Sequence, residues 1–190
     1  MIAAILLADT DLMLDGVAVA LAPWEERETL IEWQIAQLQE AGAGVIQVVL
    51  GPHAERIIPL VSGNDVEPIV NDRWDEVRTG LVLAADGEAA SLRVGATATP
   101  RNTTTAIIVW ISRPRAAHMI KAVLDEHVAA GAKVSRLFSG DVLESPVCVD
   151  AEVLARMRNL PDGAGVDDVL REYDTLVVRV SGATPDLRAR

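Results

Sequence analysis

The sequence has little cysteine and little lysine, and each shortage excludes a class of function. Its single cysteine, Cys148, rules out an internal disulfide and a cysteine-rich zinc site. The apolar neighbours of Cys148 predict a buried strand residue rather than a nucleophile. Only two lysines are present, and 17 basic residues face 28 acidic ones, for a formal net charge of −11. This charge argues against nucleic acid or an anionic membrane surface as a partner.

Long apolar runs are missing as well. The run at the start of the chain, Ile2–Ala8, meets Asp9 and Asp11 and has no basic residue before it. It is too short for a membrane span and unlike a signal peptide, so we expect a cytoplasmic protein. The 190 residues, 50 % of them hydrophobic, are enough for one globular domain with a sizeable core. We expect residues 1–190 to form that single domain.

Short apolar runs alternate with longer amphipathic segments, which predicts parallel strands joined by crossover helices. Thr29 and Glu32 form a capping box ahead of an apolar helical face, and Gly42 ends that helix. The predicted strands cover residues 2–8, 45–50, 67–70, 106–111, 135–138, 146–149 and 176–180. The other predicted helices cover residues 53–61, 74–85, 116–130, 151–158 and 166–173. Residues 86–105 follow neither period and are predicted to form a loop.

A doubly wound sheet binds its ligand at the carboxyl ends of its strands. Chemistry is therefore expected just after Ala8, Leu50, Val70 and Ile111.

Several segments together resemble one known family. The likeness is clearest in residues 29–42 (TLIEWQIAQLQEAG) and 45–57 (VIQVVLGPHAERI). It continues through residues 71–74 (NDRW), 107–114 (IIVWISRP), 160–165 (LPDGAG) and 183–186 (ATPD). These segments resemble the MobA-like nucleotidyltransferases, which attach GMP or CMP to molybdopterin. The resemblance implies a three-layer α/β fold with a mostly parallel, doubly wound, Rossmann-like sheet of the nucleotide-diphospho-sugar transferase type.

The segment at the place of the family's phosphate loop departs from the family pattern. In that loop, glycines let backbone N–H groups approach a triphosphate, while Arg and Lys neutralise its charge. The resemblance places Asp9, Asp11, Met13, Asp15 and Ala18 where the family has Gly, Ser, Arg, Gly and Lys. The complete set of corresponding positions is Ala8, Asp9, Thr10, Asp11, Met13, Asp15, Gly16 and Ala18. Three carboxylates replace two cations, so we expect this loop to repel a triphosphate.

The positions that carry the family's metal ion are changed too. The resemblance places Ser112 where the family has an Asp after the central strand. It places Ala183 where the family has an acidic or amide residue before Thr-Pro, and neither residue is a charged oxygen ligand. Residues 144–146 (ESP) stand at the family's Gly-His-Pro, and residues 77–81 look like a shortened Gly-x-x-Ser-Ser-Leu segment.

Four residues are candidates to line a ligand crevice: Asn71, Trp74, Arg113 and Arg115. The two arginines either hold an anionic ligand or pair with the acidic loop opposite. Trp24 is either core or an exposed contact for a partner.

The acidic and imidazole side chains favour no metal site. Asp9, Asp11 and Asp15 lack the Gly and the distant Glu of a calcium loop, which favours a solvated acidic turn over a metal site. The three histidines are predicted to be surface or capping residues: His53, His118 and His127.

Two functions of different classes remain. The first is a MobA-like domain that has lost catalysis and works as a binding or assembly component, linked to molybdenum cofactor biosynthesis. It would need no cofactor and would bind a protein partner or a small anionic ligand. The second is an active transfer of GTP or CTP to molybdopterin or a related acceptor. It would use Mg²⁺ in a site rebuilt from Asp9, Asp11 or Asp141, and binding of Mg-GTP or Mg-CTP separates the two.

Overall fold

The computed structural model describes residues 1–25, 29–63, 65–74, 84–139 and 142–180. Its centre is a seven-stranded sheet in the order β5-β4-β1-β6-β8-β7-β9. The strands are β1 (Ile2–Ala8), β4 (Val45–Leu50), β5 (Val66–Val70), β6 (Thr105–Trp110), β7 (Val134–Ser139), β8 (Val142–Asp150) and β9 (Thr175–Arg179). Only β8 runs antiparallel to its neighbours, β6 and β7. The predicted mostly parallel sheet is confirmed.

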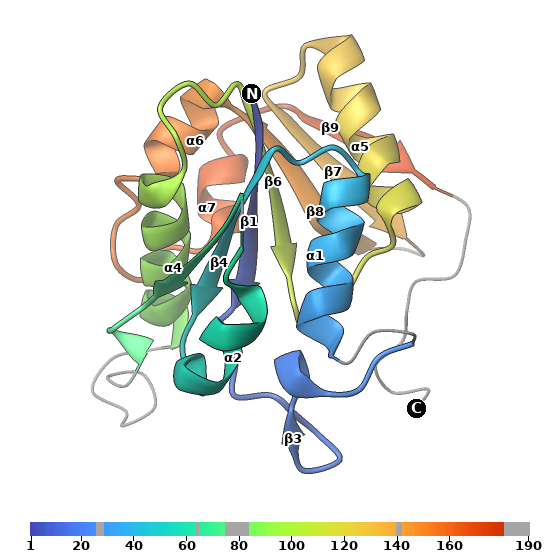
Figure 1. Cartoon of the computed structure of the whole chain (residues 1–190). Coiled ribbons are helices and arrows are strands. Elements are labelled where there is room, and N and C mark those ends of the chain that lie inside the picture. The colour runs from blue at the N-terminus through green and yellow to red at the C-terminus, as the bar shows by residue number, and fades with distance from the viewer. Residues whose placement is uncertain (26–28, 64, 75–83, 140–141, 181–190) are drawn as a thin grey trace.

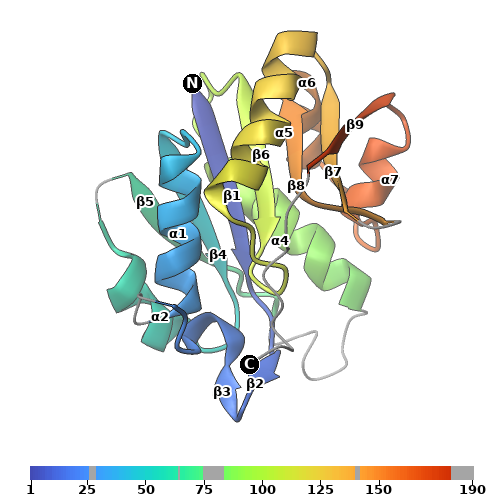
Figure 2. The same cartoon turned by 90° about the vertical axis from the view of Figure 1, so that its right-hand side faces the viewer.

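Helices cover both faces of this sheet (Figures 1 and 2). One face carries α1 (Leu30–Glu40), α2 (Ala54–Val61) and α5 (Ala117–Ala130), and the other carries α4 (Ala84–Ala98), α6 (Ala151–Met157) and α7 (Val166–Leu170). Side chains along β1 alternate between the two cores. Leu6 packs in the first core, with α1 and α5, and Ile5 and Leu7 pack in the second, with α4. The chain therefore has the expected three-layer α/β architecture.

The predicted cap of α1 is present. Thr29 Oγ1 accepts a hydrogen bond from the backbone N–H of Glu32 at 3.4 Å and donates one to Glu32 Oε2 at 2.6 Å. The helix buries Leu30, Ile31 and Leu38 against the sheet. Its Gln34 side chain also exchanges two hydrogen bonds with the backbone of Arg115, which fixes the start of α5 to α1.

The prediction of a loop over residues 86–105 is wrong, because most of this segment is the helix α4. The helix is rich in Ala and lies close against the sheet. A Cβ atom at Gly95 would lie 2.6 Å from Ile5 Cγ2, so only glycine permits this approach. Small residues give a weak hydrophobic period, which is why the sequence pattern missed the helix. Of the helix predicted over residues 74–85, residues 75–83 lie outside the described part of the chain.

Trp24 and His127 are both buried, although the sequence left an exposed position open for Trp24 and predicted a surface or capping position for His127. Trp24 is 2 % exposed and packs on Trp33, with ring centroids 5.8 Å apart, so it offers no contact to a partner. His127 is buried, not a surface or capping residue, and its Nδ1 lies 2.9 Å from Ser135 Oγ. Burial lowers the pKa of His127. Cys148 is buried in β8 as predicted, and burial raises its pKa.

Among the described residues, none of the helices has the length and apolar character that crossing a membrane requires.

Candidate functional site

The carboxyl ends of β1, β4 and β6 point to one edge of the sheet, where a small hairpin follows β1 (Figure 1). The hairpin pairs β2 (Met13–Leu14) with β3 (Val17–Ala18). Its turn residues, Asp15 and Gly16, have φ angles of 51° and 80°. Positive φ at both positions is the geometry of a two-residue type I′ turn, and Asp-Gly is a favoured sequence for it. The Asp-Gly dipeptide could therefore have predicted this hairpin, which the sequence analysis did not include.

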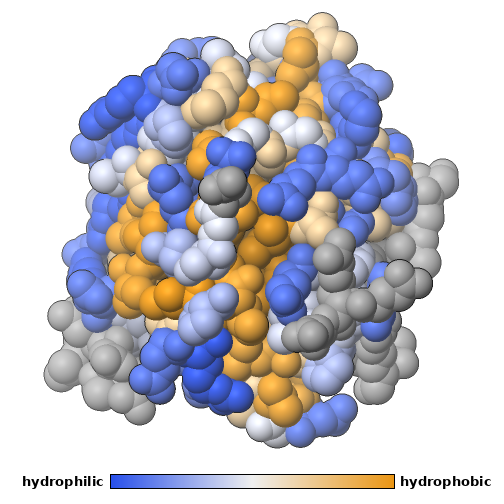
Figure 3. All heavy atoms as spheres, in the orientation of Figure 1, coloured by the Kyte–Doolittle hydropathy of each residue, from blue (hydrophilic) through white to orange (hydrophobic). Residues whose placement is uncertain are grey.

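The hairpin occupies the place expected for a phosphate loop and presents acidic and apolar side chains. Asp11 and Asp15 are exposed, and Leu12 and Met13 are 42 % and 49 % exposed. Residues 9–22 contain neither Lys nor Arg. Apolar atoms also gather over this end of the face that carries α1 and α2 (Figure 3). Residues 9–22 therefore supply none of the cations that a triphosphate requires.

Asp9 turns inward at the end of β1. Ser91 on α4 donates a hydrogen bond from its hydroxyl to Asp9 Oδ2, and Asn71 Nδ2 donates to Ser91 Oγ at 2.7 Å. Burial raises the pKa of Asp9, and the hydrogen bonds from Ser91 and Asn71 partly oppose that rise. Three segments far apart in the sequence thus meet in one hydrogen-bonded network, Asn71–Ser91–Asp9.

Gly51, which follows β4, is packed closely against this hydrogen-bonded network. A Cβ atom at Gly51 would lie 2.8 Å from Trp74 Cγ and 3.1 Å from Asp9 Cβ. The indole Nε1 of Trp74 is buried and has no hydrogen-bond partner among the described residues. The side chains of Trp74 and Asp9 therefore pack directly against the backbone of Gly51. Asn71 and Trp74 lie here as expected, and their contact with a ligand stays a prediction.

Arg115 has a structural role instead of the expected place in a ligand crevice. It is 1 % exposed and forms an ion pair with Glu144. Its Nε donates to Ser145 O at 2.6 Å and its Nη1 to Pro114 O at 3.0 Å. These partners enclose the guanidinium group, so a ligand has no access to it. Arg113 is exposed and Ser112 is partly buried.

A second pair of arginines, which the sequence reasoning missed, converges on Asp162. Arg73 Nη1 lies 2.8 Å and Arg93 Nη2 lies 2.6 Å from the same oxygen, Asp162 Oδ1. Arg93 also donates to the carbonyl of Leu160. Hydrogen bonds from Arg93 and Arg73 lower the pKa of Asp162.

The reason for the omission is the assignment of residues 86–105 to a loop. Residues 87–92 (GEAASL) have Gly, Ser and Leu at the spacing of the family's Gly-x-x-Ser-Ser-Leu segment, with Ser91 as its second serine. This match could have pointed to the region of α4 that carries Ser91 and Arg93. The sequence analysis instead placed the Gly-x-x-Ser-Ser-Leu segment at residues 77–81, which lie outside the described residues.

A further carboxyl group lies near Asp9. Burial raises the pKa of Glu88, and the negative charges of Asp167, Asp9 and Asp168 raise it further. No three Asp, Glu, His or Cys side chains within the described ranges are grouped so as to hold a metal ion. Ala183 and Asp141, which the sequence reasoning named for a metal site, fall outside those ranges.

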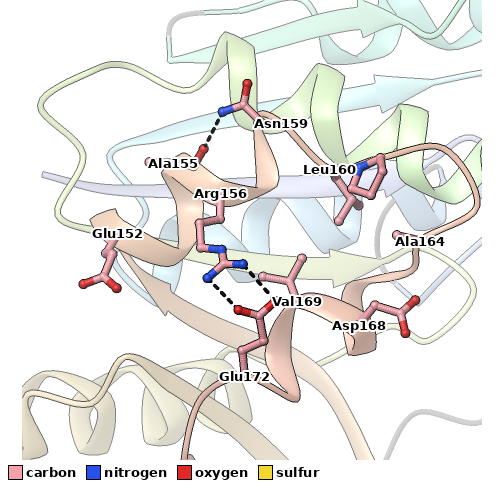
Figure 4. A pocket seen from close by; sticks show the side chains of 10 residues that line it. Glu152, Ala155, Arg156, Asn159, Leu160, Ala164, Asp168, Val169 and Glu172 are labelled. Carbon is pink, nitrogen blue, oxygen red and sulfur yellow. Dashed lines mark hydrogen bonds and ion pairs between the residues drawn. The ribbon is translucent and has the colours of Figure 1, made fainter.

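A separate cavity of about 550 Å³ lies between α6 and α7 (Figure 4). Leu160 and Val169 line it, and Arg156 and Glu172 point toward one another across it with a hydrogen bond of 2.8 Å. Both side chains of this ion pair are about half exposed, so Arg156 and Glu172 satisfy one another at the rim of the cavity.

No family model and no curated protein matches this sequence. Solved structures do match the fold. Rv0371c from Mycobacterium tuberculosis H37Rv has a TM-score of 0.76 and 18 % identity, covering 97 % of this chain and 90 % of its own. A nucleotidyl transferase from Methanothermobacter thermautotroptrophicus has a TM-score of 0.73 and 22 % identity, covering 96 % and 88 %.

The molybdopterin-guanine dinucleotide biosynthesis protein A from Archaeoglobus fulgidus is also similar. Its TM-score is 0.63 at 12 % identity, and the match covers 94 % of this chain and 83 % of the other. At these identities the likeness concerns the fold. The chain thus has a nucleotidyltransferase-like α/β fold of the nucleotide-diphospho-sugar transferase type.

One neighbour corrects the expectation about cofactors. A second structure of Rv0371c is a complex with manganese, with a TM-score of 0.73 and 18 % identity over 97 % of this chain. The prediction of no cofactor, with Mg²⁺ only for an active transferase, is therefore wrong, because a protein of similar fold has been solved with a bound metal.

Proposed function

We propose that this chain is a MobA-like protein that binds a ligand or partner without transferring a nucleotide, as an assembly component linked to molybdenum cofactor biosynthesis. The segment of residues 9–18, which contains the hairpin, carries this proposal. It stands where a nucleotidyltransferase needs glycines and cations, and it presents Asp11 and Asp15 instead. At an effective dielectric of about 20, each misplaced charge near a phosphate costs several kcal/mol.

The hydrogen-bonded network Asn71–Ser91–Asp9, next to the hairpin, supports the same function. The carboxyl group of Asp9 occupies the end of β1, and Gly51 and Trp74 pack around it. A triphosphate would have to displace these side chains as well as overcome the acidic charge. A basic, apolar segment of a protein partner complements the exposed Leu12 and Met13 and their acidic neighbours better than a nucleotide does.

The competing function is nucleotidyl transfer with a rebuilt metal site. The manganese complex of Rv0371c favours it, as do two carboxyl groups whose pKa values burial raises, Asp9 after β1 and Glu88 on α4. The described residues alone assemble no three-ligand site, so we derive no catalytic step through a metal.

Thermal unfolding with nucleotides tests the two functions against each other. Mg-GTP, Mg-CTP and their Mn²⁺ forms, at millimolar concentration, should each raise the melting temperature by less than about 1 °C. A ligand at 100 times its Kd would add about 2.7 kcal/mol, which amounts to several degrees for a domain of this size. A shift of that size, or release of pyrophosphate with a molybdopterin acceptor, would establish the competing function.

A repair experiment tests whether the hairpin is the cause. The variant Asp9→Gly, Met13→Arg, Ala18→Lys should gain nucleotide binding that weakens with salt, because the new cations act on the phosphates. The matched control, Val128→Lys with Val177→Arg and Asp125→Asn, raises the net charge by the same three units at exposed positions outside the hairpin. Equal binding by both variants would show that the gain comes from net charge and not from the hairpin.

A further inference from the structure

Strand β9 ends the central sheet and is paired on one side only. It runs parallel to β7, in a register that extends from Val134 opposite Thr175 to Phe138 opposite Arg179. Within the described ranges no strand lies on its other side, so β9 is an edge of the sheet (Figure 1). Backbone N–H and C=O groups on the outer side of an edge strand have no ladder partner. This edge is therefore open to one more strand.

The two edges of the sheet differ in their ability to accept a strand. The other edge strand, β5, contains Pro68, which has no backbone N–H to donate. The sequence of β9 (TLVVR) contains no proline, so each of its residues keeps both backbone groups. Val178 packs in the core, whereas Val177, on the opposite face of the strand, is 41 % exposed. An added strand at β9 would cover this apolar side chain.

Opposite charges lie at the two ends of β9. Asp174 precedes the strand and is exposed, and Arg179 ends the strand and lies over the ring of Phe138, with its guanidinium carbon 4.5 Å from the ring centroid. Among the described residues, neither Asp174 nor Arg179 has an ion-pair partner. An antiparallel pair joins the opposite ends of two strands, whereas a parallel pair joins like ends. Two antiparallel copies of β9 would therefore bring Arg179 of one copy next to Asp174 of the other.

We propose that two copies of this chain associate through β9, in an antiparallel pair centred on Val177, and thereby join their two seven-stranded sheets into one. The interface is the same surface on both copies, as a two-fold axis requires. Val177 of one copy lies against Val177 of the other at this axis, and Arg179 of each copy lies opposite Thr175 of the other, beside Asp174.

This dimer leaves the site after β1 accessible. Strands β1 and β9 run in the same direction, so the acidic hairpin of each copy lies at the edge of the sheet to which β9 points. In an antiparallel dimer these two edges point away from each other. The inference therefore does not depend on the proposed function and stands or falls separately from it.

The length of β9 limits the strength of the association. A pair of five-residue strands buries less surface than the roughly 1,600 Å² of a standard interface. We therefore expect a reversible dimer with a Kd on the order of 10 µM.

Sedimentation equilibrium of the full chain, from about 1 µM to about 200 µM, measures the association. The unaltered chain should pass from monomer to dimer over this range. Val177→Lys sets two like charges against each other at the axis and should weaken dimerisation at least about tenfold. The matched control is Val128→Lys, at another exposed valine, and it should leave the Kd unchanged. A monomer at every concentration, or equal weakening by both variants, would overturn the proposal.

A charge exchange tests the antiparallel direction. Arg179→Asp and Asp174→Arg should each weaken dimerisation about three- to tenfold, because each places like charges at the two ends of the interface. The double variant, Asp174→Arg with Arg179→Asp, restores opposite charges without a change in net charge and should recover most of the loss. Failure of the double variant to associate better than either single variant would contradict this direction.

A cross-link tests the position of the axis. Residues directly opposite in an antiparallel pair have Cα atoms about 4.5 or 5.5 Å apart, within the range of about 4.4–6.8 Å that a disulfide spans. With oxidised glutathione as the oxidant, Val177→Cys should form a disulfide-linked dimer on a non-reducing gel much faster than Val128→Cys does. The native Cys148 is buried and does not compete. Equal rates for the two variants, in a chain that sediments as a dimer, would show that the copies meet through another surface.

Discussion

The arginines that follow β5 and β6 have opposite roles. Arg115, after β6, is buried and donates to two backbone carbonyls as well as pairing with Glu144. Arg73, after β5, is partly exposed and shares Asp162 with Arg93. A buried guanidinium enclosed by carbonyl groups serves the structure, because its removal leaves acceptors without donors. Arg73 and Arg93 instead share an exposed carboxylate at the surface, where water screens both ion pairs.

The largest expected effect comes from removing the buried arginine. Arg115→Met should lower the free energy of unfolding by about 3–5 kcal/mol, because Glu144 and the buried carbonyl of Ser145 lose their partner. Urea unfolding followed by circular dichroism measures this. The control Arg113→Met, at an exposed neighbouring position, should change stability by less than about 0.5 kcal/mol. Equal losses in the two variants would contradict a structural role for Arg115.

A smaller effect of opposite sign is expected at the end of β1. Because burial raises the pKa of Asp9, the unfolded chain loses this proton at a lower pH than the folded protein does. The free energy of unfolding therefore falls as the pH rises from the ordinary pKa of an aspartate to the raised one, and it stays lowered above that. Asp9→Asn should therefore stabilise the protein at pH 7 by on the order of 1 kcal/mol, or about 2–4 °C, while an amide oxygen still accepts from Ser91.

The pH dependence gives the check. The advantage of Asp9→Asn over the unaltered chain should shrink as the pH falls toward 4, where the unaltered carboxyl group is protonated in the folded protein. Asp125→Asn, at an exposed position, provides the reference for removal of one negative charge. Destabilisation by Asp9→Asn at pH 7 would show that the ionised carboxylate is needed, which favours a metal or catalytic role.

The smallest effect on stability is expected at the surface pair. Arg93→Met should cost no more than about 1 kcal/mol, because Asp162 remains solvated and keeps Arg73 as a partner. The same urea measurement, made beside Arg115→Met, compares one substitution in two environments. If Arg93→Met costs as much as Arg115→Met, then the Asp162 group is structural and the distinction between the two arginine sites fails.

Parts of this molecule follow from neighbouring residues in the sequence. The run Ile2–Ala8 predicts a strand covered on both faces, and Thr29 with Glu32 predicts the start of α1, because both features depend on contacts within a few residues. The absence of cations after β1 is also a property of the sequence alone. These features were sufficient to predict the fold class and to predict that the segment after β1 repels a triphosphate.

The acidic hairpin shows the limit of that reasoning. The sequence alone does not distinguish Asp9, Asp11 and Asp15, yet Asp9 is partly buried and accepts a hydrogen bond from Ser91, while Asp11 and Asp15 are exposed. The difference arises because α4 passes over the end of β1, and α4 was not predicted. Burial, and with it the raised pKa of Asp9, cannot be read from a residue type.

Neighbouring residues were enough to predict the strands of the central sheet, the capped helix and the acidic character of the segment after β1. The burial of Arg115, the close approach of α4 to Ile5 at Gly95 and the meeting of Arg73 and Arg93 at Asp162 became visible only in the folded structure. Local elements depend on the periodicity and chemistry of adjacent residues, which the sequence displays directly. Contacts across 69 or 89 residues depend on how those elements pack, and burial and charge pairing are properties of that packing.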